Sequence, residues 1–284
     1  MSISVLNWDA ERLQAQLQNV DPGFRLEILA SVDSSNSELM RRARAGNCPP
    51  TLLVAQTQSA GRGRLGRQWH SANAQQAGQS LTFSMGRVLP MRDWSGLSLA
   101  VGVCIAQCLE PRTGADKAAL IGLKWPNDLW WQERKLAGIL IETTAHGPDI
   151  YVVVGVGVNI AVPEAPGIAQ AVAGLEEFAP DADAAQVMLR LAAPLARTLG
   201  EFATEGFAPF KAGFEARDVL RGRQVMGLSR LEEGAAPDWL GQACGVAVDG
   251  ALLVHTAKGM QRITSSEVKI RPVGQAGSTP VRAS

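Results

Sequence analysis

A segment that combines glycines with arginines, residues 58–71, offers the most distinctive chemistry in the sequence. Gly61, Gly63 and Gly66 have the G-x-G-x-x-G spacing of a dinucleotide-binding turn. Such a turn opens directly into a helix, and an acidic side chain about 20 residues later holds a ribose. Here no helical apolar period follows, and the next acidic residue is Asp93. The sequence therefore argues against a dinucleotide fold.

The arginines of the same segment, Arg62, Arg64 and Arg67, leave two interpretations open. They could lie on an exposed surface loop, or they could belong to a mobile loop that closes on a phosphate. Glycine lets a backbone approach a ligand closely, and the guanidinium fork matches phosphate oxygens. No Asp or Glu occurs between residues 39 and 92, whereas eight arginines do. If folding gathers several of them, the local field favours an anionic ligand.

Two polar motifs could complete a binding site. In "DSSN", residues 33–36, Ser35 and Glu38 have the spacing of a helix capping box. The motif predicts either a simple helix start or a group of polar side chains that point into a pocket. "GVGVN" ends a strongly apolar run, and its glycines weaken a strand unless something approaches closely. Asn159 at its end could read a base edge or cap the chain.

A third motif, "KWPNDLWWQERKLAG", contains two lysines, Lys124 and Lys135, on either side of a turn with Asp128. Simple alternation along the following strand places Lys135 on one face with three apolar residues, Ala137, Ile139 and Ile141. An ammonium at the start of such a face suggests an anionic partner. A lysine at a strand end that reaches solvent fits the position equally well.

Composition limits the classes of protein that fit these motifs. The chain has 284 residues, 46% of them hydrophobic, and its 27 basic residues balance 27 acidic ones. This balance argues against a general binder of nucleic acid or membrane surfaces. The four cysteines and three histidines lack the spacing of zinc ligands, which predicts structural thiols and a reducing, cytoplasmic setting. We also expect no signal peptide and no membrane span.

The expected elements place these motifs at the ends of strands and helices. Periodicity predicts helices near residues 8–18, 35–45, 94–110 and 188–202, and Pro194 should kink or split the last of them. Strands are predicted near residues 24–32, 51–58, 79–86 and 149–162, with a three-stranded run between residues 118 and 144. Short strands after Asp218, with a hairpin signal at Asp249-Gly250, predict a small antiparallel barrel or sandwich.

Taken together, the order and intervals of "DSSN", "QTQSAGRGRLGRQWHS", "KWPNDLWW", "RKLAGILIE" and "GVGVNI" resemble the biotin protein ligases over residues 26–273. The resemblance implies an α+β fold, a catalytic domain like that of class II aminoacyl-tRNA synthetases with a mixed sheet flanked by helices. This domain would span residues 1–217, including a short N-terminal helical extension. A small SH3-like β-barrel would follow at residues 218–274, and a flexible tail at residues 275–284.

The resemblance also implies roles for residues that match the family's motifs. Ser35 stands where the family has threonine, and Leu65 where some members have another arginine. The catalytic residues would be Lys135 and Arg64, with Asp128 and Lys124 in less defined roles. The implied biotin contacts are Ser34, Ser35, Asn36, Gln58, Arg62, Gly63, Arg64, Lys135 and Gly138. The implied ATP and adenylate contacts are Gly61, Arg62, Arg64, Gly66, Trp69, Asn127, Lys135 and Asn159.

The implied activity is ATP-dependent conversion of biotin to biotinyl-5′-adenylate, with Mg²⁺ accompanying the ATP, and transfer of biotin to a lysine of the biotin carboxyl carrier protein of acetyl-CoA carboxylase. We expect a cytoplasmic monomer or weak homodimer. No DNA binding is expected, because only about 25 residues precede the catalytic domain and a winged helix-turn-helix needs roughly 60. The alternatives are a lipoate protein ligase and a non-enzymatic RNA-binding protein.

Overall fold

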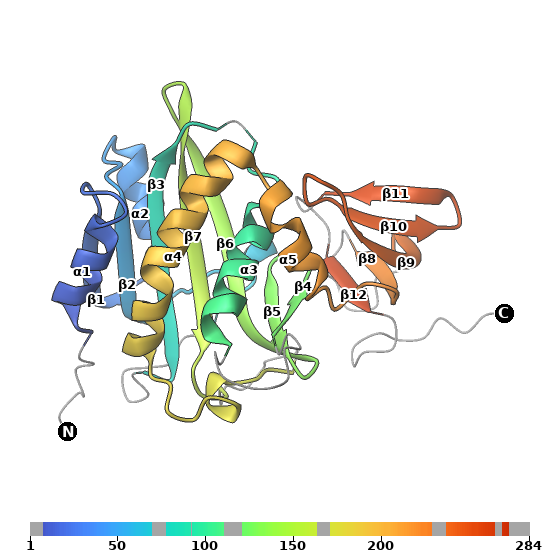
Figure 1. The fold of residues 1–284 in the computed structure, drawn as a ribbon, viewed down its shortest axis with the longest axis horizontal. Helices are drawn as coiled ribbons and strands as arrows, with labels where there is room; N and C mark the ends of the chain where they lie inside the picture. Colours follow the sequence, from blue (N-terminus) through green and yellow to red (C-terminus); the bar gives the residue numbers. More distant parts are fainter. Residues whose placement is uncertain are drawn as a thin grey trace.

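The architecture is that of a computed structural model, which describes residues 8–69, 78–91, 93–110, 121–163, 171–228, 237–264 and 269–272. A seven-stranded sheet has the order β1-β2-β3-β7-β6-β5-β4 (Figure 1). Only the β1–β2 pair is parallel, and every other neighbouring pair is antiparallel. The strands are β1 (Arg25–Val32), β2 (Thr51–Gln58), β3 (Ser80–Leu89), β4 (Gly122–Lys124), β5 (Asp128–Trp131), β6 (Arg134–His146) and β7 (Asp149–Asn159).

Helices cover both faces of this sheet, because its central strands carry apolar side chains on both sides. Leu53 and Ala55 of β2 pack beneath α2, whereas their neighbours Leu52 and Val54 belong to the larger core on the other face. In Figure 1, α3 and α4 cross that second face. The helices are α1 (Ala10–Gln18), α2 (Ser35–Arg44), α3 (Leu97–Leu109), α4 (Ala184–Glu205) and the short α5 (Lys211–Glu215).

The helix that contains Pro194 differs from one expectation. Helix α4 continues across Pro194 from Ala184 to Glu205, so the predicted option of a split is wrong. Proline costs the helix a hydrogen bond, but a long apolar stripe of α4 is buried in the core and offsets that loss. The predicted stripe itself is confirmed, since all of its members are at most 2% exposed: Met188, Leu191, Leu195, Leu199 and Phe202.

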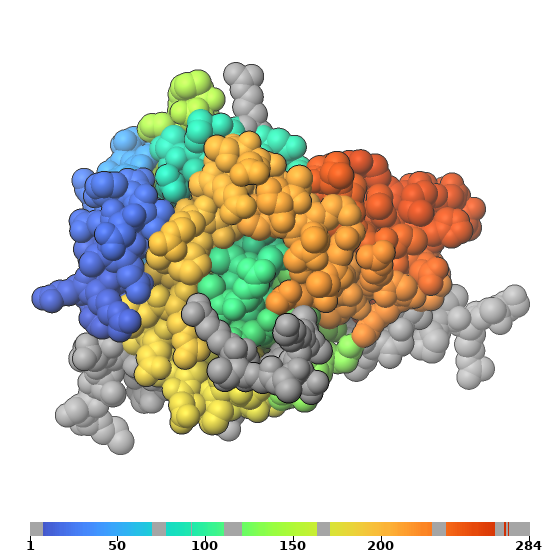
Figure 2. Space-filling model, in the orientation of Figure 1, coloured from blue at the N-terminus to red at the C-terminus, as the bar shows by residue number. Residues whose placement is uncertain are grey.

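A second, smaller sheet follows with the order β11-β10-β9-β8-β12, and Figure 2 shows it as a lobe beside the first. Its strands are β8 (Gln224–Leu228), β9 (Trp239–Val246), β10 (Leu252–Thr256), β11 (Gly259–Ile263) and β12 (Lys269–Pro272). The predicted hairpin between β9 and β10 is confirmed, and Gly250 has the positive φ of 82° that its turn needs. Across the residues that the structure describes, no pairing joins β11 to β12, so a closed SH3-like barrel is not confirmed.

Two expectations concern the ends of the chain and its relation to membranes. The expected tail at residues 275–284 lies outside the described residues, as do His70 and Ser71 at the end of the glycine and arginine segment. None of the helices in the described part of the chain is long and apolar enough to cross a membrane.

A crowded glycine in β3 gives a test of this packing. A Cβ on Gly86 would lie 2.2 Å from the Tyr151 hydroxyl oxygen and 3.1 Å from Leu39 Cδ1. Gly86→Ala should therefore lower the free energy of unfolding by about 1–3 kcal/mol through overpacking. Gly200→Ala in α4 is the control, since its Cβ would meet nothing within 4 Å and alanine favours a helix. Urea denaturation should show loss for the first variant and a neutral or stabilising effect for the second.

Candidate active site

The polar end of the site forms where the parallel strands β1 and β2 stop together. Val32, the last residue of β1, pairs with Gln58, the last residue of β2, so the start of α2 lies beside the Gln58 side chain. The backbone N–H and the hydroxyl of Ser35 both donate to Gln58 Oε1, at 2.8 and 3.1 Å. The residues Ser34, Ser35 and Asn36 are all buried, as a pocket requires.

The cap of α2 lies one residue earlier than the capping-box spacing predicts. Ser34, not Ser35, is the N-cap, and its hydroxyl oxygen accepts a hydrogen bond from the Ser37 N–H at 3.4 Å. Glu38 instead forms ion pairs with Arg41 and Arg42 along the helix. Both interpretations of the motif are thus partly correct, because Ser34 caps the helix and Ser35 faces the buried polar group.

Ser84 belongs to the same polar group, although the sequence interpretation missed it. Ser84 Oγ lies 2.7 Å from Ser35 Oγ and 2.6 Å from Asn36 Oδ1. The Asn36 amide donates to the carboxylate of Glu142 at 3.0 Å. A Cβ on Gly155 would lie 2.2 Å from Asn36 Oδ1, so only glycine leaves room for this amide. The available signal was the buried polar row Ser80, Thr82 and Ser84, which alternates with apolar residues in β3.

The glycine and arginine segment folds as a tight hairpin over the sheet. The Trp69 N–H donates to the Gly61 carbonyl at 2.9 Å, and the Gly63 N–H donates to the Arg67 carbonyl at 2.7 Å. Leu65 and Gly66 turn the chain with φ values of 55° and 70°. A Cβ on Gly61 would lie 2.5 Å from the Trp69 carbonyl oxygen, so glycine is required there for close approach.

This hairpin places the Trp69 ring on glycines of the two central strands. A Cβ on Gly157 would lie 2.3 Å from Trp69 Cε2, and one on Gly138 would lie 3.4 Å from its Cζ3. The Lys135 ammonium lies 5.8 Å from the centre of the same ring. Among the described residues the buried Trp69 indole N–H has no hydrogen-bond partner. The Trp69 ring therefore covers the sheet at the site, although its buried indole N–H lacks the hydrogen bond that such groups usually make.

The arginines point into the site rather than into solvent alone. Arg62 donates to Ser37 Oγ at 3.2 Å and lies 3.1 Å from Glu142 Oε1. Arg64 donates to Asn127 Oδ1 at 3.4 Å. Burial lowers the pKa of Arg64, the Arg67 charge lowers it further, and Asp128 partly opposes both. Arg67 thus adds a second positive charge beside the partly buried guanidinium of Arg64. An anion bound near both would stabilise their charged forms.

The lysines of the third motif meet one buried carboxylate. Lys135 Nζ lies 2.7 Å from Asp128 Oδ1, and the Lys124 ammonium lies 4.7 Å from the centre of the Trp130 ring. Burial raises the pKa of Asp128, but the nearby charges of Lys135 and Lys124 together outweigh it, so the net pKa is lowered. Asp128 is therefore ionised at neutral pH.

The predicted face for Lys135 is wrong, because β6 is irregular. Trp130 pairs with Lys135 while Leu129 pairs with Ala137, so Leu136 is an extra residue on β6. The bulge puts Lys135 on the face of Gly138, whose Cβ would lie 3.1 Å from Lys135 Nζ. The other predicted members of that face lie against the opposite core, where Ala137 and Ile139 are buried.

The two asparagines of the site differ in their surroundings. The Asn127 amide donates to the Ile139 carbonyl at 2.8 Å, which leaves its oxygen for Arg64. The Asn159 amide donates to the carbonyls of Lys135 at 3.3 Å and Ala173 at 3.0 Å. Asn159 thus fixes the backbone behind the site, and its adenine contact stays a prediction.

The cavity enclosed by these groups is small. It measures about 40 Å³ and is lined by residues of all three motifs, among them Ser35, Asn36, Gln58, Trp69 and Gly138. Pockets that hold drug-sized ligands measure about 300–1,000 Å³. A substrate of that size does not fit this cavity as the structure has it, and the predicted movement of the hairpin at residues 61–69 stays a prediction.

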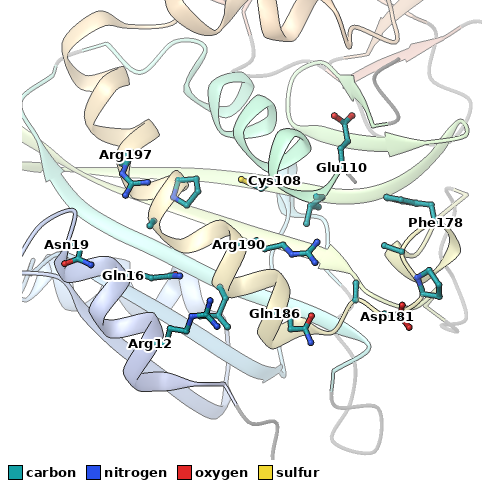
Figure 3. Close-up of a pocket in the computed structure, with 17 residues that line it drawn as sticks. Arg12, Gln16, Asn19, Cys108, Glu110, Phe178, Asp181, Gln186, Arg190 and Arg197 are labelled. Atoms are coloured by element: carbon teal, nitrogen blue, oxygen red, sulfur yellow. The ribbon is translucent and has the colours of Figure 1, made fainter. Parts of the chain in front are cut away.

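A larger hollow of about 880 Å³ lies on the other face of the sheet (Figure 3). It lies between α1, α4 and the end of α3, and Arg12, Arg190 and Arg197 are among its lining residues. No residue expected to bind substrate lines it. In the described part of the chain, no cluster of three or more His, Cys, Asp or Glu side chains is suited to holding a metal ion.

Comparisons with known proteins agree with this geometry. Residues 31–159 match the Biotin/lipoate A/B protein ligase family. The biotin protein ligase of Aquifex aeolicus, solved in complex with biotin and ATP, is 30% identical and has a TM-score of 0.69, covering 87% of this chain and 99% of its own. The mixed sheet flanked by helices is thus the fold of biotin protein ligases.

Curated relatives identify the family. The Biotin--[acetyl-CoA-carboxylase] ligase of Paracoccus denitrificans is 32% identical, and the match covers 85% of this chain and 98% of the relative. The Bifunctional ligase/repressor BirA of Salmonella typhimurium is 31% identical, with 93% and 78% covered. The chain belongs to the biotin/lipoate protein ligase family, and it is an enzyme of the biotin protein ligase kind.

Removal of the Lys135 charge tests the electrostatics of the site. Lys135→Met should lower the free energy of unfolding at pH 7 by about 1–3 kcal/mol, because a buried carboxylate loses a partner. The Asp128 pKa is lowered in the folded state, so this contribution is complete above the unfolded pKa of about 3.9 and declines as pH falls through the folded pKa. The difference between variant and wild type should therefore shrink below about pH 4.

Denaturant titrations between pH 3 and pH 7 measure this difference. The control is Lys211→Met, which breaks a half-exposed pair with Glu215 on one helix and should change stability by at most about 0.5 kcal/mol. An equal effect of both substitutions at every pH would contradict the argument.

Proposed function

We propose that the enzyme activates biotin with ATP to form biotinyl-5′-adenylate and then transfers biotin to a lysine of a biotin carboxyl carrier protein. The observation that carries this proposal is a single array in which a buried polar pocket opens onto a cluster of cations beneath a glycine-rich hairpin. The Aquifex aeolicus ligase, which shares the fold, was solved with biotin and ATP together.

The polar pocket suits the ureido end of biotin, which carries two N–H donors and one carbonyl acceptor. Ser35, Asn36, Gln58 and Ser84 provide hydroxyl and amide groups within hydrogen-bond distance of one another. In this structure they satisfy each other, so biotin would replace existing partners rather than meet unpaired groups. The glycines of β6 and β7 carry no side chain beside these groups, so an apolar ring system could lie on the sheet there if the Trp69 ring moved aside.

The cations suit the first chemical step. The biotin carboxylate is ionised at pH 7, with a pKa near 4, so it needs no general base. One carboxylate oxygen attacks the α-phosphorus of ATP, a new O–P bond forms, and pyrophosphate leaves. The barrier lies in bringing two anions together, which positioned cations reduce. Lys135 and Arg64 would supply these cations, and Lys124, whose charge also acts on Asp128, would add to them.

Asp128 suits orientation better than proton transfer. Its pKa is lowered by the lysines, so its carboxylate is a weak base at neutral pH. Its contact with Lys135 holds that ammonium toward the pocket. Mg²⁺ keeps most of its ligands from water and phosphate, and Asp128 is the carboxylate among the predicted site residues that could add one. When bound, the ion would neutralise charge on the triphosphate.

The second step is acyl transfer. The carrier lysine, as a neutral amine, attacks the acyl carbon, the amide bond forms, and AMP leaves with the electrons of the broken C–O bond. A lysine has a reference pKa of about 10.4, so entry into a desolvated site favours loss of its proton. The hairpin at residues 61–69 would exclude water from the mixed anhydride until the carrier arrives.

The two alternatives find less support in the arrangement. A lipoate ligase would not need the ureido-type polar pocket around Ser35 and Asn36. An RNA-binding surface would need exposed arginines interleaved with aromatics, but Arg64 is half-buried and directed at Asn127.

Exchange of ATP with labelled pyrophosphate discriminates among these activities. The enzyme should catalyse exchange with biotin and not with lipoate or without an acid. Exchange with lipoate alone would overturn the biotin assignment, and no exchange with either would overturn the ligase chemistry.

Lys135→Ala should abolish adenylate formation, because the reacting anions lose their nearest flexible cation. Pyrophosphate release in a single turnover measures this step. Release at the wild-type rate would remove Lys135 from the mechanism. Lys211→Ala is the matched control, since its pair with Glu215 lies on α5 outside the site.

Arg64→Gly should release biotinyl-adenylate early, because the hairpin loses its link to Asn127. The free adenylate would then label lysines of unrelated proteins, which a blot of a mixed protein sample detects. Arg44→Gly, at the exposed end of α2, is the control and should label the carrier alone. An adenylate retained as tightly as in the wild type would show that the hairpin does not hold it.

A further inference from the structure

The catalytic side chains of the first sheet are concentrated on one three-stranded meander. Strands β4, β5 and β6 carry Lys124, Asp128 and Lys135, and the turn between β4 and β5 carries Asn127. This meander lies at the edge of the sheet, beside the second sheet in Figure 1. Short edge strands are poorly fixed by their own ladder, so other contacts must hold them in place.

One such contact joins the first turn of the meander to the hairpin tip of the second sheet. The Trp125 indole N–H donates to the Gly250 carbonyl at 2.9 Å, and the Trp125 side chain is only 2% exposed. A Cβ on Gly250 would lie 2.6 Å from Gly96 Cα, so the tip also fits tightly against the start of α3. Ser98 of that helix donates to the Pro126 carbonyl at 2.6 Å. The turn is thus held between α3 and the second sheet.

A second contact holds the other turn of the meander. Gln132 and Glu133 form the tight turn between β5 and β6, with φ values of 47° and 63°. Both carboxylate oxygens of Glu133 accept hydrogen bonds from Arg223, each at 2.7 Å. Arg223 directly precedes β8, so this bidentate pair also reaches the meander from the second sheet.

The chain between the two sheets lies along the outer strand. The Leu123 N–H donates to the Arg217 carbonyl at 2.7 Å, and the Val219 N–H donates to the Leu123 carbonyl at 3.2 Å. The edge of β4 is therefore paired with the segment that leads into the second sheet. The meander is held at both turns and along its outer edge by residues that follow the catalytic motifs by about 80 residues or more.

We propose that the second sheet positions the catalytic meander, and that Trp125 and Arg223 are positioning residues for the adenylation step. Neither side chain is placed to touch substrate. They act through Asn127, which holds Arg64, and through Asp128, which holds Lys135. The polar pocket for the ureido group is built mainly on α2, β2 and β3. It touches the meander at Leu140 and Glu142 of β6, which accept hydrogen bonds from Asn36, and not at the contacts of Trp125 or Arg223. Loss of either contact should slow the chemistry without weakening recognition of biotin. This inference rests on the proposed ligase function.

The test of Trp125 is steady-state pyrophosphate exchange by full-length Trp125→Phe, which keeps the ring packing and removes the donor. We expect kcat to fall about tenfold or more, since a small misplacement of catalytic groups is costly, while KM for biotin stays within about twofold. Trp8→Phe is the control: Trp8 is buried in the core but its indole N–H has no partner among the described residues. Equal kinetics of the two variants would overturn the role of Trp125.

The test of Arg223 is a double-mutant cycle with Arg223→Gln and Glu133→Gln. The pair is 42% and 52% exposed at its two side chains, so its loss should leave the fold intact. Each single variant should lower kcat by a similar factor, and the double variant should lower it no further, because both remove one contact. Wild-type kcat in the single variants, or multiplied losses in the double variant, would overturn the proposal.

The two arms separate failure of this inference from failure of the proposed function. No biotin-dependent exchange by the wild type would refute the function itself. An active wild type with unaffected Arg223 and Glu133 variants would refute the positioning role alone. If Trp125→Phe unfolds, as circular dichroism would show, the exposed Arg223 pair still decides the outcome.

Discussion

The ion pair of Lys135 with Asp128 is the interaction on which the geometry of the candidate active site depends. A carboxylate as buried as Asp128 is costly unless cations compensate it, and two lysines do so from neighbouring strands. Arg62 pairs with Glu142, but the single carboxylate of Asp128 does not balance Lys124, Lys135 and Arg64 near it. The candidate site therefore keeps an excess of positive charge, which the proposed adenylation would use. The bulge in β6 contributes to this compensation, because it brings the Lys135 ammonium to Asp128.

Glycines of the central strands provide the room that other side chains of the site need above the sheet. Gly138, Gly155 and Gly157 lie on neighbouring strands and remove side chains from the middle of the sheet face that also carries Thr82 and Ser84. Asn36 from α2 and Trp69 from the hairpin occupy the opened area. The weakness that glycine brings to a strand is offset because β7 lies in the centre of the sheet between two long partners.

Much of this arrangement follows from the sequence because local rules decide it. The strands, the long helices and the hairpin at Asp249-Gly250 came from periodicity and turn chemistry, whereas the roles of the motifs came from their resemblance to the biotin protein ligases. The face of Lys135 did not, since a bulge is set by pairing with β5 and leaves no local signature. The N-cap of α2 is Ser34 and not the predicted Ser35, because Ser35 donates instead to Gln58, 23 residues away in the sequence. Ser84 and Glu142 were missed because their roles arise only from tertiary contact. The contacts of Trp125 and Arg223 were equally beyond reach, since they join segments about 90–125 residues apart.

The mutual satisfaction of Ser35, Asn36, Gln58 and Ser84 has a consequence for substrate discrimination. A pocket whose polar groups already bond one another gains little from an incoming hydrogen bond, because each new bond replaces an old one. A compound of similar shape that lacks one donor or acceptor would break the internal network and leave a buried group orphaned. The free-energy cost of that orphaned group weakens binding of the analogue. The ratio of affinities for substrate and analogue can therefore be large even when the affinity for the substrate itself is modest.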